Sequence, residues 1–212
     1  MKSTKKVTNG KDISMMTKRG KWLMNIGTWN VRGLNSKEPE LVQEFKKNKL
    51  LGITETKKKG QGFQRLENNH ILMYSGVVKT ERARGGVGLM MKEETKQLIT
   101  DWKFIDERLM CVKMSGMGEQ EYNIIVTYGP QETAMQEEKE RYYQKIQETI
   151  DDTTGPIILM GDLNGRVGRQ SGENKKAVGK HGEDIEASPN GNLLTNLCSK
   201  IDLVITNTMF PH

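Results

Sequence analysis

The stretch Pro156-Ile157-Ile158-Leu159-Met160-Gly161-Asp162-Leu163-Asn164 joins an apolar run to a turn that carries a carboxylate and a carboxamide. The apolar run predicts a buried strand, and open α/β sheets place their chemistry beyond the carboxyl ends of such strands. Residues i and i+2 of an extended segment point the same way, so we expect Asp162 and Asn164 to converge. An acid beside a neutral donor suits water activation next to a phosphoryl group. The sequence Gly-Asp-x-Asn is also common in turns, and this motif alone does not establish a site.

Three other apolar runs also end in a polar side chain. They are Ile26-Gly27-Thr28-Trp29-Asn30, Leu50-Leu51-Gly52-Ile53-Thr54-Glu55 and Asn123-Ile124-Ile125-Val126-Thr127-Tyr128. The last run is followed by a Gly-Pro turn. Four separate coincidences would be needed to explain these strand ends as ordinary turns, so the pattern indicates a shared site.

The order and spacing of these motifs resemble the endonuclease/exonuclease/phosphatase superfamily, which includes apurinic/apyrimidinic endonucleases, DNase I and sphingomyelinases. The amino-acid sequences of the motifs more closely resemble the endonucleases of RTE-type non-LTR retrotransposons and the craniofacial development protein 2-like sequences derived from them. The resemblance runs from about Trp22 to His212. It is carried by GTWNVRGL, ITET, RGGVGL, DERLM, VTYGP, MGDLNGRVG and NGNLLTNLC.

The resemblance implies a four-layer α/β/β/α sandwich, whereas periodicity alone predicts only a mixed α/β or α+β fold. We expect residues 1–21 to form a basic flexible arm and residues 22–212 to form one domain that lacks its C-terminal strands. The expected strands are 25–30, 50–54, 71–75, 86–91, 109–115, 122–128, 157–161 and 201–206. The expected helices are 37–48, 135–151 and 191–199. The first has Ser36 as N-cap and Pro39 in its first turn. In the second, Thr133 and Gln136 have the spacing of a capping box.

The implied activity is that of a Mg²⁺-dependent phosphodiesterase that nicks DNA, with Mn²⁺ as an alternative cofactor. Glu55 is the candidate metal ligand, because Mg²⁺ prefers hard oxygen donors and is commonly held by one or two carboxylates. Asn30 would contact the metal's water or a phosphate. Asp162 would orient or deprotonate the attacking water, Asn164 would donate to a non-bridging oxygen, and Tyr128 would contact the phosphate or the leaving oxygen.

Three other features have competing interpretations. Arg84-Gly85-Gly86-Val87-Gly88 looks like a phosphate loop, but it lacks the Lys-Ser/Thr of a P-loop and favours a tight turn into an apolar strand. Arg108 is either an ion-paired strand residue or a substrate contact. His181 lies in a loop away from any carboxylate in the sequence and is at most a residue at the rim of the site.

The superfamily usually continues into strands that carry an Ile-Asp-Tyr-like motif and a final Ser-Asp-His. This sequence has no Asp-His dipeptide, and its histidines (His70, His181 and His212) match no such motif. We therefore expect a poor nuclease that a C-terminal extension would rescue, or a catalytically defective remnant that binds nucleic acid or protein. A lipid or inositol-phosphate phosphatase also fits on grounds of fold. Missing strands would leave residues 124–126 and 203–205 without covering neighbours.

The amino-acid composition excludes few of these functions. A chain of 212 residues suits one domain, and the net charge of +6 fits a polyanionic partner such as DNA, although much of the excess lies in the first 21 residues. Cys111 and Cys198 lack metal-ligand spacing and are expected to be reduced, packed thiols. This implies an intracellular protein, and the nucleus is one location that fits. We find no secretory signal and no stretch long enough for a membrane span. Oligomeric state stays open.

Overall fold

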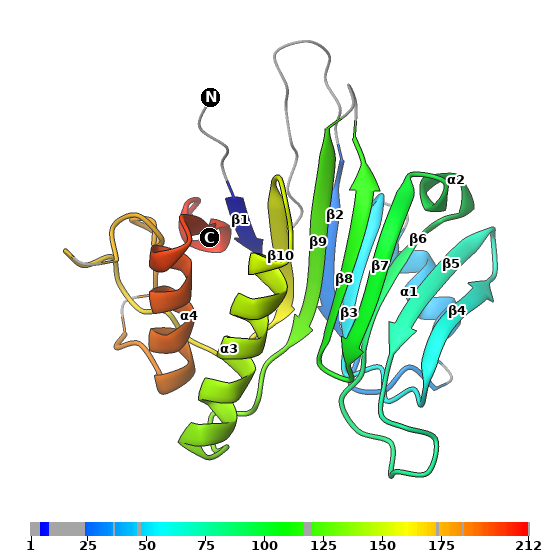
Figure 1. Ribbon diagram of the computed structural model, residues 1–212, viewed down its shortest axis with the longest axis horizontal. Helices are drawn as coiled ribbons and strands as arrows, with labels where there is room; N and C mark the ends of the chain where they lie inside the picture. Colours follow the sequence, from blue (N-terminus) through cyan, green and yellow to red (C-terminus); the bar gives the residue numbers. More distant parts are fainter. Residues whose placement is uncertain are drawn as a thin grey trace.

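Two β-sheets stacked face to face form the centre of this computed structural model (Figure 1). It describes residues 5–8, 24–35, 37–45, 48–116, 120–172, 174–183 and 185–211, the first range by its backbone alone. The first sheet has the order β11-β1-β10-β9-β8-β7, and the second has the order β2-β3-β6-β5-β4. The strands of the first sheet are β11 (Leu203–Ile205), β1 (Lys5–Thr8), β10 (Ile157–Asp162), β9 (Glu121–Tyr128), β8 (Leu109–Ser115) and β7 (Ile99–Asp106). Those of the second are β2 (Ile26–Asn30), β3 (Leu50–Thr54), β6 (Val87–Lys92), β5 (His70–Ser75) and β4 (Gln61–Leu66).

Helices cover the outer faces of both sheets (Figure 1). The helices are α1 (Glu38–Glu44), α2 (Glu93–Lys96), α3 (Gln136–Asp151) and α4 (Pro189–Lys200), with a 3₁₀ turn, η2 (Thr206–Thr208). Residues of α3 and α4 pack on the first sheet, and residues of α1 pack on the second. A third apolar cluster fills the space between the sheets. These three interfaces define four layers, so the expected α/β/β/α sandwich is confirmed.

The alternation of side chains along β9 explains how one strand serves two interfaces. Ile125 packs toward α3, whereas Ile124 and Val126 face the second sheet. All three are almost completely buried, as are Leu203 and Ile205 of β11, which pack in the cluster with α4. The expectation that these two runs lack covering neighbours is therefore wrong, because helices and neighbouring strands already cover them.

Part of the segment predicted to form the N-terminal arm lies in the first sheet. Residues 5–8 form β1, which pairs in parallel with both β10 and β11. A parallel sheet leaves backbone N–H and C=O groups along each open edge, and a short extended segment can satisfy both edges at once. The remainder of that segment lies outside the described residues, as does Trp22, the first residue of the predicted domain.

Helix starts differ from the sequence prediction in detail. The N-cap of α1 is Lys37, with Pro39 in the first turn as expected, and Ser36 lies outside the described residues. For α3 the N-cap is Met135 and no side chain caps it, so the predicted capping box is wrong. The start of α4 comes earlier than expected, since Ser188 accepts a hydrogen bond from the N–H of Gly191.

Two further expectations concern the cysteines and the membrane. Cys111 and Cys198 are both buried and free, as predicted for packed thiols. Burial raises the pKa of the Cys111 thiol to about 11 and that of Cys198 to about 12.

None of the helices in the described ranges has the length and apolar character that a membrane crossing needs.

Candidate active site

The carboxyl ends of two parallel strand pairs meet between the two sheets. In the first sheet, Tyr128 of β9 and Asp162 of β10 are register partners. In the second, Asn30 of β2 is the register partner of Thr54 in β3, which Glu55 follows. Parallel pairing brings strand ends of the same polarity to one edge, and stacking of the sheets brings the two edges together.

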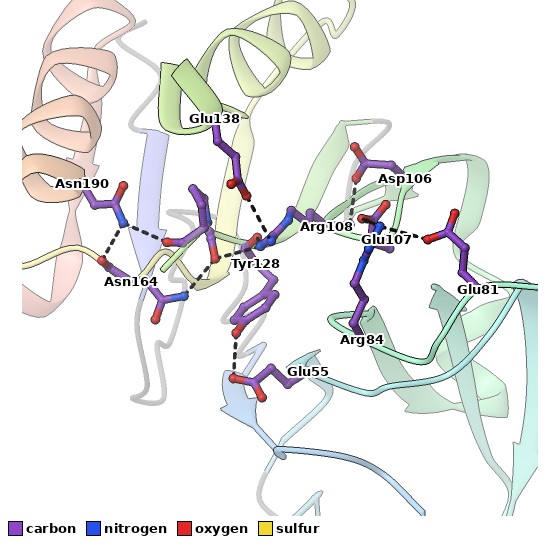
Figure 2. A network of polar contacts seen from close by, with 12 residues as sticks. Glu55, Glu81, Arg84, Asp106, Glu107, Arg108, Tyr128, Glu138, Asn164 and Asn190 are labelled. Atoms are coloured by element: carbon purple, nitrogen blue, oxygen red, sulfur yellow. Dashed lines mark hydrogen bonds and ion pairs between the residues drawn. The ribbon is translucent and has the colours of Figure 1, made fainter. Parts of the chain in front are cut away.

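The side-chain amide of Asn30 bridges the two sheets. Its Nδ2 donates to Oε1 of Glu55 at 2.9 Å and to Oδ2 of Asp162 at 2.8 Å. The hydroxyl of Tyr128 donates to the same Oε1 of Glu55 at 2.8 Å (Figure 2). The Glu55 and Asp162 carboxylates are therefore separated by no more than two hydrogen bonds through one amide nitrogen.

Both partners of the Glu55–Tyr128 hydrogen bond have shifted pKa values. Burial works to raise the pKa of Glu55, but hydrogen bonds from Asn30 and Tyr128 and the charges of Lys57 and Arg32 outweigh it, and the pKa lies below its ordinary value. Burial, with the neighbouring Glu55 carboxylate, raises the pKa of Tyr128 to about 12. At neutral pH the site therefore has an ionised Glu55 and a protonated phenol that donates.

Asn164 reaches the site through a turn. Its backbone is left-handed, with φ of +49°, and its N–H donates to Oδ1 of Asp162 at 3.0 Å. The expectation that Asp162 and Asn164 converge as residues of an extended segment is therefore wrong in its geometry, because the chain turns between them. The Nδ2 of Asn164 donates to the carbonyl of Gly129 at 2.9 Å, which ties the end of β10 to the end of β9.

Asn190, in the first turn of α4, is a site residue that the strand-end sequence patterns do not predict. It is fully buried, and its Nδ2 donates to the carbonyls of Pro130 and Asn164, each at 2.9 Å (Figure 2). It thus holds two loops of the site in one position. The signal was present in the sequence, since Ser188-Pro189 is a helix start that places Asn190 in the first turn.

Arg108 lies against Tyr128, and its donors face the protein. Its guanidinium donates to the carbonyl of Gly129 at 3.1 Å, pairs with Glu138 at 3.5 Å and lies 5.5 Å from the centre of the Tyr128 ring (Figure 2). The ion-paired interpretation of Arg108 describes these contacts. Arg108 supports Tyr128, and a contact between Arg108 and substrate stays a prediction.

The described histidines do not contact these site residues. His70 is buried, its Nδ1 lies 2.8 Å from the carbonyl of Glu67, and its ring packs edge-on against Phe45. The backbone N–H of His181 donates to the carbonyl of Thr208. His212 lies outside the described residues. Within the described ranges, the site is therefore built from carboxylates, amides and a phenol.

The donor set fits a hard divalent cation. Glu55 and Asp162 supply carboxylate oxygens and both are partly exposed. No cluster of three or more His, Cys, Asp or Glu side chains suited to a metal occurs in the described part of the chain. Mg²⁺ and Mn²⁺ accept such a set, because they bind few protein oxygens and keep water and phosphate as further ligands.

The sequence is similar to a known family and to a known protein. The sequence matches the Endonuclease/Exonuclease/phosphatase family over residues 27–211. It is 30% identical over 194 residues to craniofacial development protein 2 of Bos taurus, covering 88% of this chain and 31% of that relative, so it spans about a third of the relative's length.

The fold is similar to two solved structures. The 3′ phosphatase NExo from Neisseria, bound to product DNA hairpin, has a TM-score of 0.56 at 17% identity over 82% of this chain and 70% of its own. The AP endonuclease LMAP from Leishmania major has a TM-score of 0.51 at 12% identity over 82% and 65%. The family match covers most of the described residues, and the chain belongs to the endonuclease/exonuclease/phosphatase family.

Proposed function

We propose that this chain is the nuclease domain of a divalent-metal-dependent DNA endonuclease that hydrolyses internal phosphodiester bonds. The observation that carries the proposal is the bridge by Asn30, which joins the carboxylates of Glu55 and Asp162 from two sheets, with the Tyr128 hydroxyl on Glu55. A carboxylate pair beside neutral donors suits hydrolysis of a phosphate ester.

Each side chain has a role that follows from its contacts. The Asp162 carboxylate, held by Asn30 and by its own turn, orients the attacking water and accepts its proton. The Tyr128 phenol, protonated at neutral pH, donates to a phosphate oxygen. Asn164 donates to a non-bridging oxygen, and Asn30 keeps the carboxylates in place. Arg108 positions Tyr128, and its substrate contact is the weaker alternative.

Glu55 would hold the cation, and Asp162, joined to Glu55 through Asn30, would face the water of its hydration shell. When bound, Mg²⁺, or Mn²⁺ in its place, would neutralise charge on the phosphate. The depressed pKa of Glu55 keeps this ligand ionised and available. Asn30 retains only its amide oxygen for such a role, since both of its N–H groups face carboxylates, and that oxygen already accepts from the N–H of Arg32.

DNA is the substrate class that the comparisons favour. One structurally similar protein is described as a 3′ phosphatase bound to product DNA hairpin and another as an AP endonuclease. The resemblance to RTE-type endonucleases supports an origin in a non-LTR retrotransposon. A DNA substrate in turn supports an intracellular, nuclear location.

Plasmid nicking in Mg²⁺ tests the reaction. We expect the protein to convert supercoiled plasmid to the open circle slowly, as a poor nuclease would, and Asp162→Ala to abolish this. Asp151→Ala removes a carboxylate from the exposed face of α3 and should nick like the parent. Equal nicking by parent and Asp162→Ala would place the chemistry elsewhere.

Calorimetric titration tests the metal site. We expect weak Mg²⁺ or Mn²⁺ binding that Glu55→Gln eliminates, because the site has few carboxylate ligands. Glu140→Gln, an exposed change on α3, controls for the loss of one negative charge. Equal affinity in the parent and Glu55→Gln would move the site away from β3.

A second candidate function is DNA binding without cleavage. It is favoured by one observation: neither His70 nor His181 contacts the site, so no described imidazole is placed for acid–base work. Loss of an acid–base group typically costs about 10²–10⁴ in rate. A protein that binds duplex DNA and Mg²⁺ yet leaves plasmid supercoiled supports this function.

A further inference from the structure

A basic loop lies beside the candidate active site. It runs over residues 79–86, between β5 and β6, and ends in Arg84-Gly85-Gly86. Gly85 and Gly86 have φ of +50° and +91°, and a Cβ on Gly86 would lie 2.2 Å from Oγ1 of Thr56. The turn thus needs glycine, which confirms the prediction of a tight turn into the apolar strand β6.

This turn fixes the basic loop to the strand end that carries Glu55. The N–H of Thr56 donates to the carbonyl of Gly86 at 3.1 Å, and the N–H of Lys57 donates to that of Gly85 at 2.8 Å. The N–H of Gly86 donates to the carbonyl of Glu107 at 3.0 Å. The loop therefore keeps a defined position relative to the Glu55 carboxylate.

A pocket of about 490 Å³ lies between the loop and the site. Its lining includes Glu55 and Tyr128 of the proposed reaction centre and the cationic side chains Lys57, Arg82, Arg84 and Arg108. The pocket is thus continuous with the proposed reaction centre and is lined in part by cationic side chains.

The cations of this pocket differ in how they are compensated. Arg84 pairs with Glu81 at 3.0 Å and with Glu107 at 3.6 Å, so carboxylates already neutralise it (Figure 2). Lys57 and Arg82 are exposed, and neither forms an ion pair with a described residue. These two side chains are the ones available to an incoming anion.

The backbone supports a specific placement of Lys57. Lys57 has φ of +52°, and Arg32 and Glu55 have φ of +51° and +55°. Long side chains seldom adopt this left-handed region, which favours Gly, Asn and Asp, and such residues gather at functional sites. The left-handed turn places Lys57 in the lining of the same pocket as Glu55.

We infer that Lys57 and Arg82 form a subsite for a second backbone phosphate, next to the phosphate that is cleaved. The inference rests on the proposed function and deepens it. A polynucleotide presents a phosphate at every nucleotide, so one enters the pocket when its neighbour reaches Glu55 and Asp162. A phosphate monoester on a small molecule presents none there, so the subsite favours internal phosphodiesters of a nucleic acid.

The dependence of DNA binding on salt tests the protein side of the subsite. Binding of a short duplex is measured by fluorescence anisotropy in Mg²⁺, with Asp162→Asn in every protein to prevent cleavage. Lys57→Asn removes the charge and keeps a residue that tolerates the left-handed backbone. We expect Lys57→Asn and Arg82→Gln each to reduce the slope of log K against log salt by about 0.9. Arg65→Gln, a highly exposed change on β4, should leave the slope unchanged.

A substrate-side change locates the phosphate. Single methylphosphonate linkages, which carry no charge, are placed in turn at the positions flanking the target linkage. We expect one position at which the uncharged linkage weakens binding by the parent and has no effect on the Lys57→Asn/Arg82→Gln double variant. Such coupling between the two changes is the signature of direct contact.

The outcomes separate this subsite from the proposed function. If the parent binds DNA and the two variants keep its salt slope, the subsite is wrong and the DNA substrate stands. If Arg65→Gln lowers the slope as much as they do, only net charge matters and the subsite is also wrong. If the parent binds no DNA at any salt concentration, the subsite and the proposed substrate fall together.

Discussion

At the scale of single residues, one amide organises the candidate site. The Nδ2 of Asn30 donates to the carboxylates of Glu55 and Asp162. The two negative charges therefore have a shared hydrogen-bond donor between them. Hydrogen bonds to charged groups contribute about 1.5–3 kcal/mol each. Asn30 therefore prepares the carboxylates for a cation, which would replace a weak dipole by a full positive charge.

The pKa of Glu55 gives a prediction at this scale. Burial alone would raise it, and donors including Tyr128 lower it overall. A lowered pKa stabilises the folded state above the ordinary value of the carboxyl, and this stability is lost as the pH falls through the folded pKa. Tyr128→Phe removes one donor, so we expect the pKa of Glu55 to rise and metal binding to fail at a higher pH than in the parent. NMR titration of the Glu55 carboxyl carbon measures the shift.

Tyr74→Phe serves as the control, because its phenol forms no bond with Glu55 and its ring faces Lys58. The same Glu55 pKa in parent and Tyr128→Phe would show that the hydrogen bond has no electrostatic effect. An equal rise in Tyr74→Phe would point to a general change in the protein.

The residues of the site could be predicted from the sequence, and their contacts could not. Each of Asn30, Glu55, Tyr128 and Asp162 ends an apolar run, a pattern visible in the letters alone. The bridge by Asn30 joins it to residues 25 and 132 positions away, so it depends on how the sheets stack. Asn164 was placed by strand alternation, which its left-handed backbone breaks.

At the scale of elements, two of the strands absent from the sequence prediction, β4 and β7, lie at sheet edges, whereas β1 lies between β10 and β11. β4 alternates between exposed and partly buried residues, and its sequence QGFQRL has few apolar or β-branched side chains. β7 has two register shifts, which interrupt the period of two that marks a strand. The inner strands β3, β9 and β10 were predicted nearly to their ends, because burial on both faces makes them continuously apolar.

The first turn of α4 carries a prediction of its own. Asn190→Ala would leave the carbonyls of Pro130 and Asn164 without their donor, at about 1–3 kcal/mol for that of the buried Pro130 and less for that of the partly buried Asn164. We expect a lower free energy of unfolding in urea, together with slower plasmid nicking, because Asn164 loses one of the contacts that hold it. Asn196→Ala, exposed on the same helix, is the matched control. A variant that loses stability and nicks at the parental rate would restrict Asn190 to a structural role.

At the scale of the whole molecule, the site exists only when both sheets stack in one arrangement. Asn30 and Glu55 lie at strand ends of one sheet, since Glu55 follows β3, and Tyr128 and Asp162 lie at strand ends of the other. Gly52 of β3 lies where the sheets approach each other, since a Cβ there would be 2.7 Å from Cε of Met160 in β10. The absence of a side chain at this position lets β10 lie close to β3, and their carboxyl ends carry the two carboxylates.

Gly52→Val is therefore expected to weaken the fold and the site together. The added methyl groups meet the Met160 side chain, and overpacking of this kind costs about 1–3 kcal/mol. Each kcal/mol corresponds to about 2–4 °C in Tm for a chain of this length. Thermal unfolding and calorimetric Mg²⁺ binding measure the two effects. Gly172→Val is the control for the lost freedom of glycine, because its Cβ would meet nothing within 4 Å.

The double variant Gly52→Val/Met160→Ala separates sheet spacing from other effects of the substitution. Met160→Ala by itself leaves a cavity between the sheets, whereas in the double variant the valine occupies part of that space. We expect the double variant to bind Mg²⁺ more tightly than Gly52→Val and to lose less stability than the two single changes added together. Additive losses would show that Gly52 and Met160 act independently, and the distance between the sheets would then not be what aligns Glu55 with Asp162.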